Sequence, residues 1–155
     1  MDQAEIAVEL QHLVREHEEL RSRIESENAW WREVRELGKP RFGEMGFRLA
    51  HFRERLANHF EHEESLEESA IRQSVCKASP DQFQAMVGDH RDLLGRLDKI
   101  IAKSNDSGGS YACWGDIGLE FSELIHAIDE HESEELRLVA EILGRIAPPR
   151  NAHAT

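Results

Sequence analysis

The stretch LANHFEHEESLEESA, residues 56–70, decides the fold, because apolar and ionisable side chains share one helical spacing within it. Leu56, His59, Glu63, Leu66 and Ala70 follow one another at alternating steps of three and four residues. Side chains at these steps lie on one face of an α-helix. The stretch therefore predicts a helix whose buried face carries a histidine and a glutamate four residues apart.

Other histidines and glutamates lie outside the buried faces of the predicted helices. We expect His62 at the surface or beside Glu63, where it could tune that carboxylate or gate access to it. We expect His126 on an exposed helix face, with a role as a spare ligand as the alternative. The carboxylates expected on a solvated face are Glu64, Glu67, Glu68, Glu132 and Glu134.

Breaks in the chain separate four long segments with the same spacing. The breaks are LGKPRFG (37–43), KASPDQ (77–82) and NDSGGS (105–110), and in the second of them Ser79 precedes Pro80 as a helix N-cap. The predicted helices are residues 2–36, 43–73, 80–104 and 114–146. Four long helices with short connections predict an all-α protein, an antiparallel up-down-up-down four-helix bundle.

This bundle forms a single predicted domain. A chain of 155 residues is long enough for one sizeable core and too short for two ordinary ones. We expect the domain to cover residues 1–147 and a flexible C-terminal tail to cover residues 148–155.

Few polar side chains occupy the apolar positions of the four predicted helices. They are His17, Glu27, His59, Glu63, His90, His131 and Glu135. Counted from the breaks at about 1.5 Å per residue, all of them except Glu27 lie at about the same height in the bundle. Glu27 lies ten residues from His17, too far to join the others, and we expect it to be partly exposed.

A metal centre explains this layer best. An unpaired buried carboxylate costs several kcal/mol, whereas a metal ion satisfies carboxylates and imidazoles together. Imidazole and carboxylate ligands suit iron, manganese or zinc, and no cysteine lies near the layer to favour a soft-metal cluster. The candidate metal ligands are His17, His59, Glu63, His90, His131 and Glu135.

An internal repeat predicts the symmetry of this centre. HEELRSRI (17–24) resembles HRDLLGRL (90–97), and NHFEHEESL (58–66) resembles EHESEELRL (130–138). Each half of the chain thus supplies one lone histidine and one HxxxE pair. We expect a nearly two-fold dinuclear centre in which both carboxylates, Glu63 and Glu135, bridge the two ions.

The motifs HEEL (17–20), HFEHEE (59–64) and HESEE (131–135), with the lone His90 between them, resemble the hemerythrin-like, or HHE cation-binding, family. The resemblance covers about residues 10–142. It implies a four-helix bundle around a non-haem di-iron site with the same six residues as ligands. Leu94 stands where oxygen-carrying hemerythrins are expected to have a second histidine, so the chain looks more like members linked to iron or oxygen sensing and to iron or peroxide handling.

Composition excludes several kinds of partner. The chain carries 31 acidic residues against 19 lysines and arginines, for a formal net charge of −12, which disfavours nucleic acid and anionic membranes. No apolar run is long enough to span a bilayer, and the N-terminus lacks the features of a signal peptide. Cys76 and Cys113 form no CxxC motif, so we expect free thiols and a cytoplasmic location.

Three functional hypotheses follow. The first is a protein with two iron ions, replaceable by zinc or manganese, that binds or senses O₂, a related small oxidant or iron itself. A sensor of this kind would need a separate protein partner. The second is a di-iron enzyme that reduces peroxide, O₂ or NO. The third is a metal-free helical module for protein interaction.

Overall fold

The computed structural model describes residues 2–36, 42–74, 76–106 and 111–146, and within these ranges the side chains of 34–36, 42–43, 106 and 111–114 are not described. The described residues form four helices and no strand: α1 (Gln3–Glu36), α2 (Phe42–Arg72), α3 (Pro80–Asp106) and α4 (Tyr111–Ile146). The predicted all-α class and number of helices are confirmed. The predicted tail lies outside the described residues.

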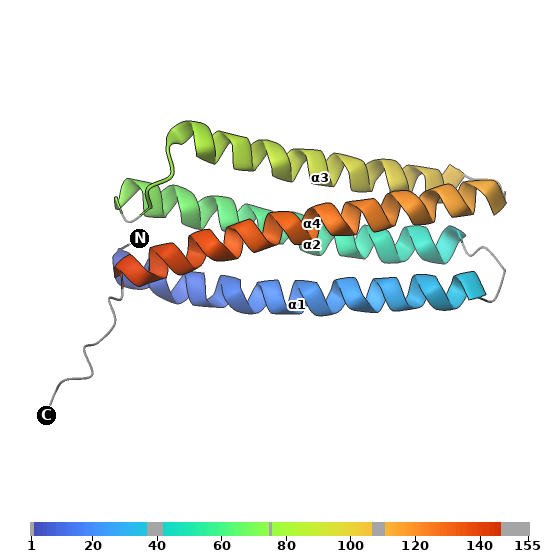
Figure 1. Ribbon diagram of the computed structural model, residues 1–155, viewed down its shortest axis with the longest axis horizontal. Coiled ribbons are helices and arrows are strands. Elements are labelled where there is room, and N and C mark those ends of the chain that lie inside the picture. The colour runs from blue at the N-terminus through green and yellow to red at the C-terminus, as the bar shows by residue number, and fades with distance from the viewer. Residues whose placement is uncertain (1, 37–41, 75, 107–110, 147–155) are drawn as a thin grey trace, which may run out of the picture.

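The four helices pack as an antiparallel bundle in which each helix contacts two neighbours (Figure 1). Helices α1 and α3 each pack against α2 and α4. The up-down-up-down topology is the one that short connections predict. Among the described residues no helix is long and apolar enough to cross a membrane.

Local sequence signals explain where two of the helices begin. The backbone N–H of Gln82 donates to Ser79 Oγ at 3.2 Å, and the N–H of Ser79 donates to Gln82 Oε1 at 2.8 Å. Asp2 and Glu5 make the same reciprocal pair at the start of α1, with both distances 2.8 Å. These capping boxes satisfy backbone donors that a helix leaves unpaired at its first turn.

A polar layer divides the hydrophobic core into two clusters. One cluster includes Leu20, Phe52 and Phe121 and lies toward the ends of the bundle where α1 meets α2 and α3 meets α4. The other includes Leu10, Leu66 and Ile142 and lies toward the opposite end. The buried histidines and most of the buried glutamates lie between the two clusters in the sequence of each helix.

Helix α3 buries one member of each of two adjacent apolar pairs. Its buried apolar residues include Leu93 and Ile100, whereas Leu94 and Ile101 are only partly buried. The helix carries adjacent apolar pairs at these levels, so spacing alone does not decide which member of each pair faces inward. His90 is buried on either alternative.

The expectation of partial exposure was wrong for Glu27, which is 3% exposed. Arg48 Nε donates to Glu27 Oε2 at 3.0 Å, and Arg23 Nε lies 3.6 Å from Oε1. These two guanidinium groups cover the carboxylate and pair its charge, which lets it remain buried away from the polar layer.

Candidate metal centre

The six candidate ligands lie together in the polar layer, and a seventh residue, Glu132, lies with them. They form two groups in which the ligand atoms all lie within 4.8 Å of one another. The first cluster is His17, His59, Glu63 and Glu132, and the second cluster is Glu63, His90, His131 and Glu135. Each cluster could hold one metal ion, and that these residues are ligands stays a prediction.

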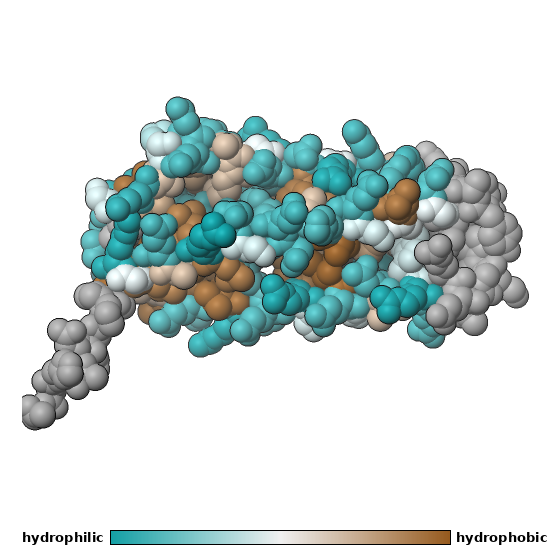
Figure 2. Space-filling view, viewed as in Figure 1, coloured by the Kyte–Doolittle hydropathy of each residue, from teal (hydrophilic) through white to brown (hydrophobic). Residues whose placement is uncertain are grey.

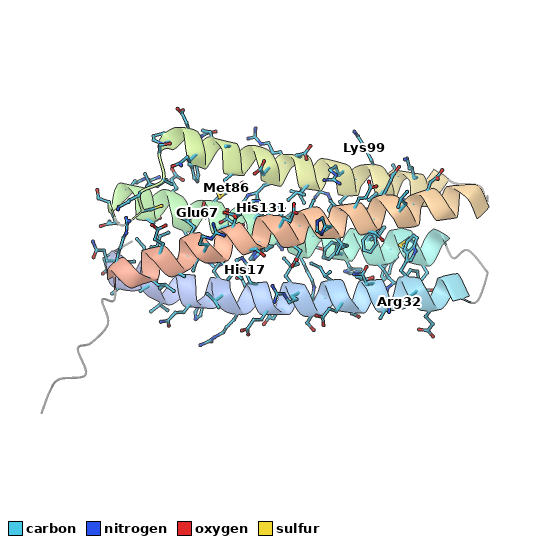
Figure 3. The ribbon with its side chains drawn as sticks, viewed as in Figure 1. His17, Arg32, Glu67, Met86, Lys99 and His131 are labelled. Atoms are coloured by element: carbon cyan, nitrogen blue, oxygen red, sulfur yellow. The ribbon has the colours of Figure 1, made fainter. Side chains whose placement is uncertain are left out.

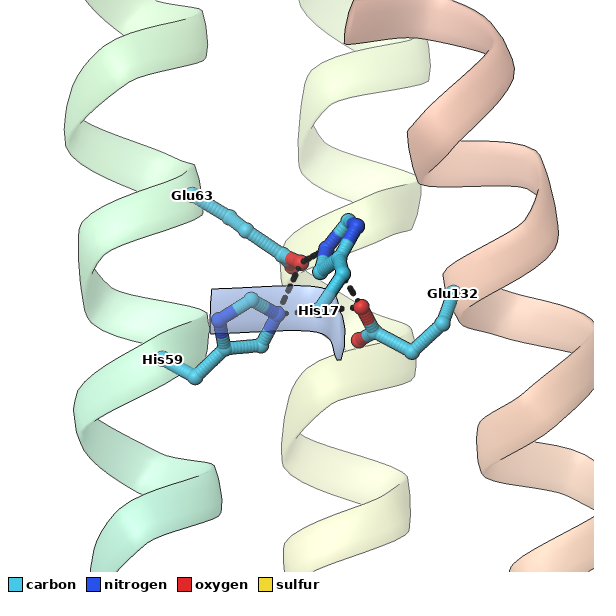
Figure 4. Close-up of side chains that lie close together, drawn as sticks. All are labelled: His17, His59, Glu63 and Glu132. Atoms are coloured by element: carbon cyan, nitrogen blue, oxygen red, sulfur yellow. Dashed lines mark hydrogen bonds and ion pairs between the residues drawn. The ribbon is translucent and has the colours of Figure 1, made fainter. Parts of the chain in front are cut away.

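In the first cluster, two imidazoles face two carboxylates at short distances (Figure 4). Glu63 Oε1 lies 2.7 Å from Nε2 of His17 and 2.6 Å from Nε2 of His59. Glu132 Oε2 lies 2.5 Å from Nε2 of His17 and 2.9 Å from Nε2 of His59. All four donor atoms therefore converge on one point from α1, α2 and α4.

In the second cluster, donor atoms converge without satisfying one another. Glu63 Oε2 lies 3.0 Å from His90 Nε2, in a poor direction for a hydrogen bond, and 3.9 Å from His131 Nε2. Glu135 Oε1 also lies 3.9 Å from His131 Nε2. The buried atoms without a hydrogen-bond partner among the described residues include Glu63 Oε2, His90 Nε2, His131 Nε2 and Glu135 Oε2. A cation would satisfy all four, and leaving them unpaired costs about 1–3 kcal/mol for each group.

Glu63 joins the two clusters. It is fully buried, and its Oε1 faces the imidazoles of the first cluster while its Oε2 faces those of the second. The structure differs here from the expectation that Glu63 and Glu135 both bridge. Glu135 belongs to the second cluster alone, and Glu132 supplies the other carboxylate of the first.

The expectation of a solvated face was wrong for Glu132, which is 7% exposed. Successive helical residues are about 100° apart, so Glu132 points toward α1 while its neighbour His131 points toward α3. The available sequence signal was its position next to His131, because a residue beside an inward-facing one lies at the edge of the buried face. Glu67 was also expected to be solvated and is 2% exposed.

Carboxylates on neighbouring helices contact the outer nitrogens of two of the imidazoles at hydrogen-bond distance and lie farther from that of a third. His59 Nδ1 lies 3.0 Å from Glu16 Oε2, and His90 Nδ1 lies 2.9 Å from Glu64 Oε1. His131 Nδ1 lies 4.0 Å from Asp89 Oδ2. A metal-binding histidine commonly donates its second N–H to such a group, which fixes the ring and leaves the other nitrogen free for the metal.

His62 and His126 lie outside both clusters. His62 is half-buried, and its Nδ1 and Nε2 lie 2.8 Å from Glu16 and 3.1 Å from Glu9. His62 thus extends the contacts of His59 toward the surface through Glu16. His126 is exposed and lies 3.1 Å from Glu130 on its own helix.

An aromatic ring braces the second cluster. The ring of Phe60 stacks on that of His90 with centroids 4.0 Å apart and planes 7° apart. The centroid of the Phe60 ring also lies 5.6 Å from that of His131, with the two planes nearly perpendicular. Phe60 is 2% exposed, so this contact restricts the rotation of both imidazoles.

Charge pairing sets the protonation of the first cluster. Burial opposes the charge on His17 and His59, but their hydrogen bonds to Glu132 and Glu63 outweigh it. The pKa of His17 is raised to about 9 and that of His59 to about 11. Burial would raise the pKa of Glu63, but contacts with the surrounding imidazoles, that of His131 first, hold it well below its usual range. Two imidazolium protons therefore balance two carboxylates where a divalent cation would do the same.

A second carboxyl pair lies beside the second cluster. Burial and a hydrogen bond to Glu135 raise the pKa of Glu67 to about 11, so Glu67 carries a proton at neutral pH. Burial also raises the pKa of Glu135, against the hydrogen bond from Glu67, which lowers it. The pair remains buried because one proton removes one of its two charges.

Two grooves flank α4 and reach different halves of the centre. The α3–α4 groove has a volume of about 740 Å³ and is lined by His131, Glu135 and Glu67 among others. The α1–α4 groove has a volume of about 660 Å³ and reaches His17 and Glu132. Figure 2 shows this face of the molecule, where hydrophobic side chains are visible between hydrophilic ones. Each cluster thus contributes residues to a groove on its own side of α4, although its donor atoms are buried.

The residues present fit a pair of divalent cations. Each cluster offers two imidazole nitrogens and two carboxylates, a donor set that suits iron, manganese or zinc. Comparison with known protein families, curated proteins and solved structures finds no match to this chain. The assignment therefore depends on the geometry of the clusters and on their chemistry.

Metal binding to the first cluster is expected to release protons. His17 and His59 hold their protons up to pH values of about 9 and about 11, so a cation must displace both at neutral pH. Affinity for Co(II) should rise between about pH 6 and pH 9, with close to two protons released per ion bound there. Calorimetry in buffers of different ionisation enthalpy measures this number. His17→Gln should lower it by about one, and binding that is independent of pH would contradict the assignment.

Glu67→Gln is expected to stabilise the metal-free protein above neutral pH. Below about pH 4.5 Glu67 is protonated in both the folded and the unfolded chain. At higher pH only the folded chain keeps the proton, so the free energy of unfolding falls as the pH rises toward about 11. Glutamine removes this loss, and the free energy of unfolding at about pH 8 should rise by roughly 2 kcal/mol.

Denaturant unfolding of the metal-free protein at acidic and alkaline pH checks this expectation. The matched control is Glu68→Gln, one residue along α2, where the carboxylate is exposed and pairs with Arg72 at 2.6 Å. The control should change stability by less than about 0.5 kcal/mol at any pH. A Glu67→Gln protein with the same pH dependence as the wild type would show that Glu67 is not buried in its protonated form.

Proposed function

We propose that this protein binds two iron ions, one in each cluster, and that it uses them to bind or sense O₂, a related small oxidant or iron itself. The observation that carries the proposal is the position of Glu63. Its two oxygens face two different sets of imidazoles, and each set is completed by a second carboxylate. A single buried carboxylate with this surrounding is suited to bridge two cations.

The donor set limits the choice of metal, and the family resemblance then favours iron. The donor atoms are imidazole nitrogens and carboxylate oxygens, which also suit manganese and zinc. The resemblance of the same residues to the hemerythrin-like family favours iron among these. Zinc or manganese could replace iron in the same clusters.

The chain's own residues prepare the site for a small ligand. Glu16 and Glu64 orient His59 and His90 through their outer nitrogens, and Phe60 packs against the second cluster. Bound iron would supply redox chemistry and coordination positions that protein ligands do not fill. The grooves on either side of α4 let a small molecule approach both clusters.

A second candidate function is reduction of peroxide, O₂ or NO with electrons from an external donor. One contact chain favours it: Glu9 meets His62, His62 meets Glu16, and Glu16 meets His59. Reduction of peroxide to two waters consumes two electrons and two protons, and this chain of hydrogen bonds connects the centre with the surface. Binding alone does not require such a connection.

Exposure of the Fe(II)-loaded protein to O₂ separates the two functions. For binding or sensing, an absorption band should appear with O₂ and disappear when O₂ is removed, with the iron count unchanged. For an enzyme, peroxide should disappear catalytically with an added reductant, and both Glu63→Ala and His62→Gln should slow the loss. A loaded protein that responds to none of O₂, peroxide and NO would contradict the enzyme and the binding or sensing of O₂ or a related oxidant, and of the proposed functions only binding or sensing of iron itself would stand.

A further inference from the structure

The α3–α4 groove differs from the α1–α4 groove in the carboxyl groups at its inner end. Seven carboxyl groups and three cationic side chains line the α3–α4 groove, and four carboxylates and one arginine line the α1–α4 groove. Both grooves are therefore acidic and would attract a cation. The buried carboxylate that the α1–α4 groove reaches, Glu132, is a member of the first cluster. The α3–α4 groove instead reaches Glu67, a buried carboxyl group that belongs to neither cluster.

Two buried carboxyl groups, each with one unpaired oxygen, lie at the inner end of the α3–α4 groove. Glu67 and Glu135 line it and are 2% and 5% exposed. Oxygen Oε1 of Glu67 and oxygen Oε2 of Glu135 have no hydrogen-bond partner among the described residues. Figure 3 shows Glu67 with Met86 and His131 in the space between α3 and α4. These oxygens are placed to bind a hard cation, which would displace the proton that Glu67 holds.

The two carboxylates continue the donor row of the centre. Glu67 lies one helical turn beyond Glu63 on α2, and Glu135 lies one turn beyond His131 on α4. Glu135 is shared between the pair and the second cluster. A cation bound by Glu67 and Glu135 would need only to move along Glu135 to enter the second cluster.

We propose that the α3–α4 groove admits divalent cations and that Glu67 with Glu135 forms a transit site, the first buried position that a cation occupies before it reaches the second cluster. The ligand class is a hard divalent cation such as Fe²⁺ or Mn²⁺. Glu67 is a delivery residue here and not a ligand of the loaded centre, since it belongs to neither cluster. This inference rests on the proposed function, because it requires that the clusters take up metal.

The test measures how fast the metal-free protein takes up Co(II), which absorbs visible light when bound and is stable in air. Stopped-flow mixing gives the loading rate, excess chelator gives the release rate, and titration gives the affinity. Glu67→Gln should slow loading and release together by at least about tenfold and change the affinity by less than about threefold, because a transit site alters the path and not the end states.

Two tryptophan variants are designed to obstruct one groove each. Ala85 is exposed on α3 and lines the α3–α4 groove, and Ser122 is exposed on α4 and lines the α1–α4 groove. Ala85→Trp should slow loading by at least about fivefold, whereas Ser122→Trp should leave the rate within about twofold of the wild type. Because both positions are exposed, these variants test the route even if Glu67→Gln does not fold.

The outcomes separate this inference from the proposed function. A wild-type protein that takes up no Co(II) overturns both. A protein that binds two ions, but loads at the wild-type rate in Glu67→Gln and Ala85→Trp, overturns the transit site and leaves the proposed function standing. Faster release with unchanged loading in Glu67→Gln would make Glu67 a ligand of the centre, which also overturns the transit site.

Discussion

The structure depends on one buried carboxylate, that of Glu63, and on the imidazoles that surround it. The side chain is fully buried, yet contacts with the imidazoles of His131, His17, His59 and His90 keep its pKa well below the usual range. A carboxylate at this depth without such partners would cost several kcal/mol. Since these partners come from all four helices, the need to satisfy Glu63 constrains how the helices align with one another.

The same layer weakens the metal-free protein. It divides the apolar core into two clusters and leaves several buried polar atoms without partners among the described residues. The first cluster is balanced by protons on its imidazoles, whereas the second cluster stays partly unsatisfied. Metal ions would replace the protons of one cluster and satisfy the open donors of the other, so binding should be coupled to stability.

Helical spacing was sufficient to predict the four helices, their arrangement and the group of six residues that lie together. It worked because a residue such as His59 shares its face with Leu56 and Leu66, and burial of that face follows from the apolar neighbours. Spacing could not find Glu132 or Glu67, since both lie beside the inward face and are buried through contacts with other helices, Glu132 with His17 and Glu67 with Glu135. It also could not place Glu27, whose burial depends on Arg48 from another helix.

The most direct measurement is the metal content of the protein purified without oxygen, compared with that of Glu63→Gln. The account predicts two iron ions per chain after loading with Fe(II), a higher melting temperature when loaded, and loss of both ions in the variant, because Glu63 belongs to both clusters. Fewer than about 0.2 ions per chain with no change in melting temperature on adding Fe(II) would contradict it. So would a Glu63→Gln protein that still binds two ions.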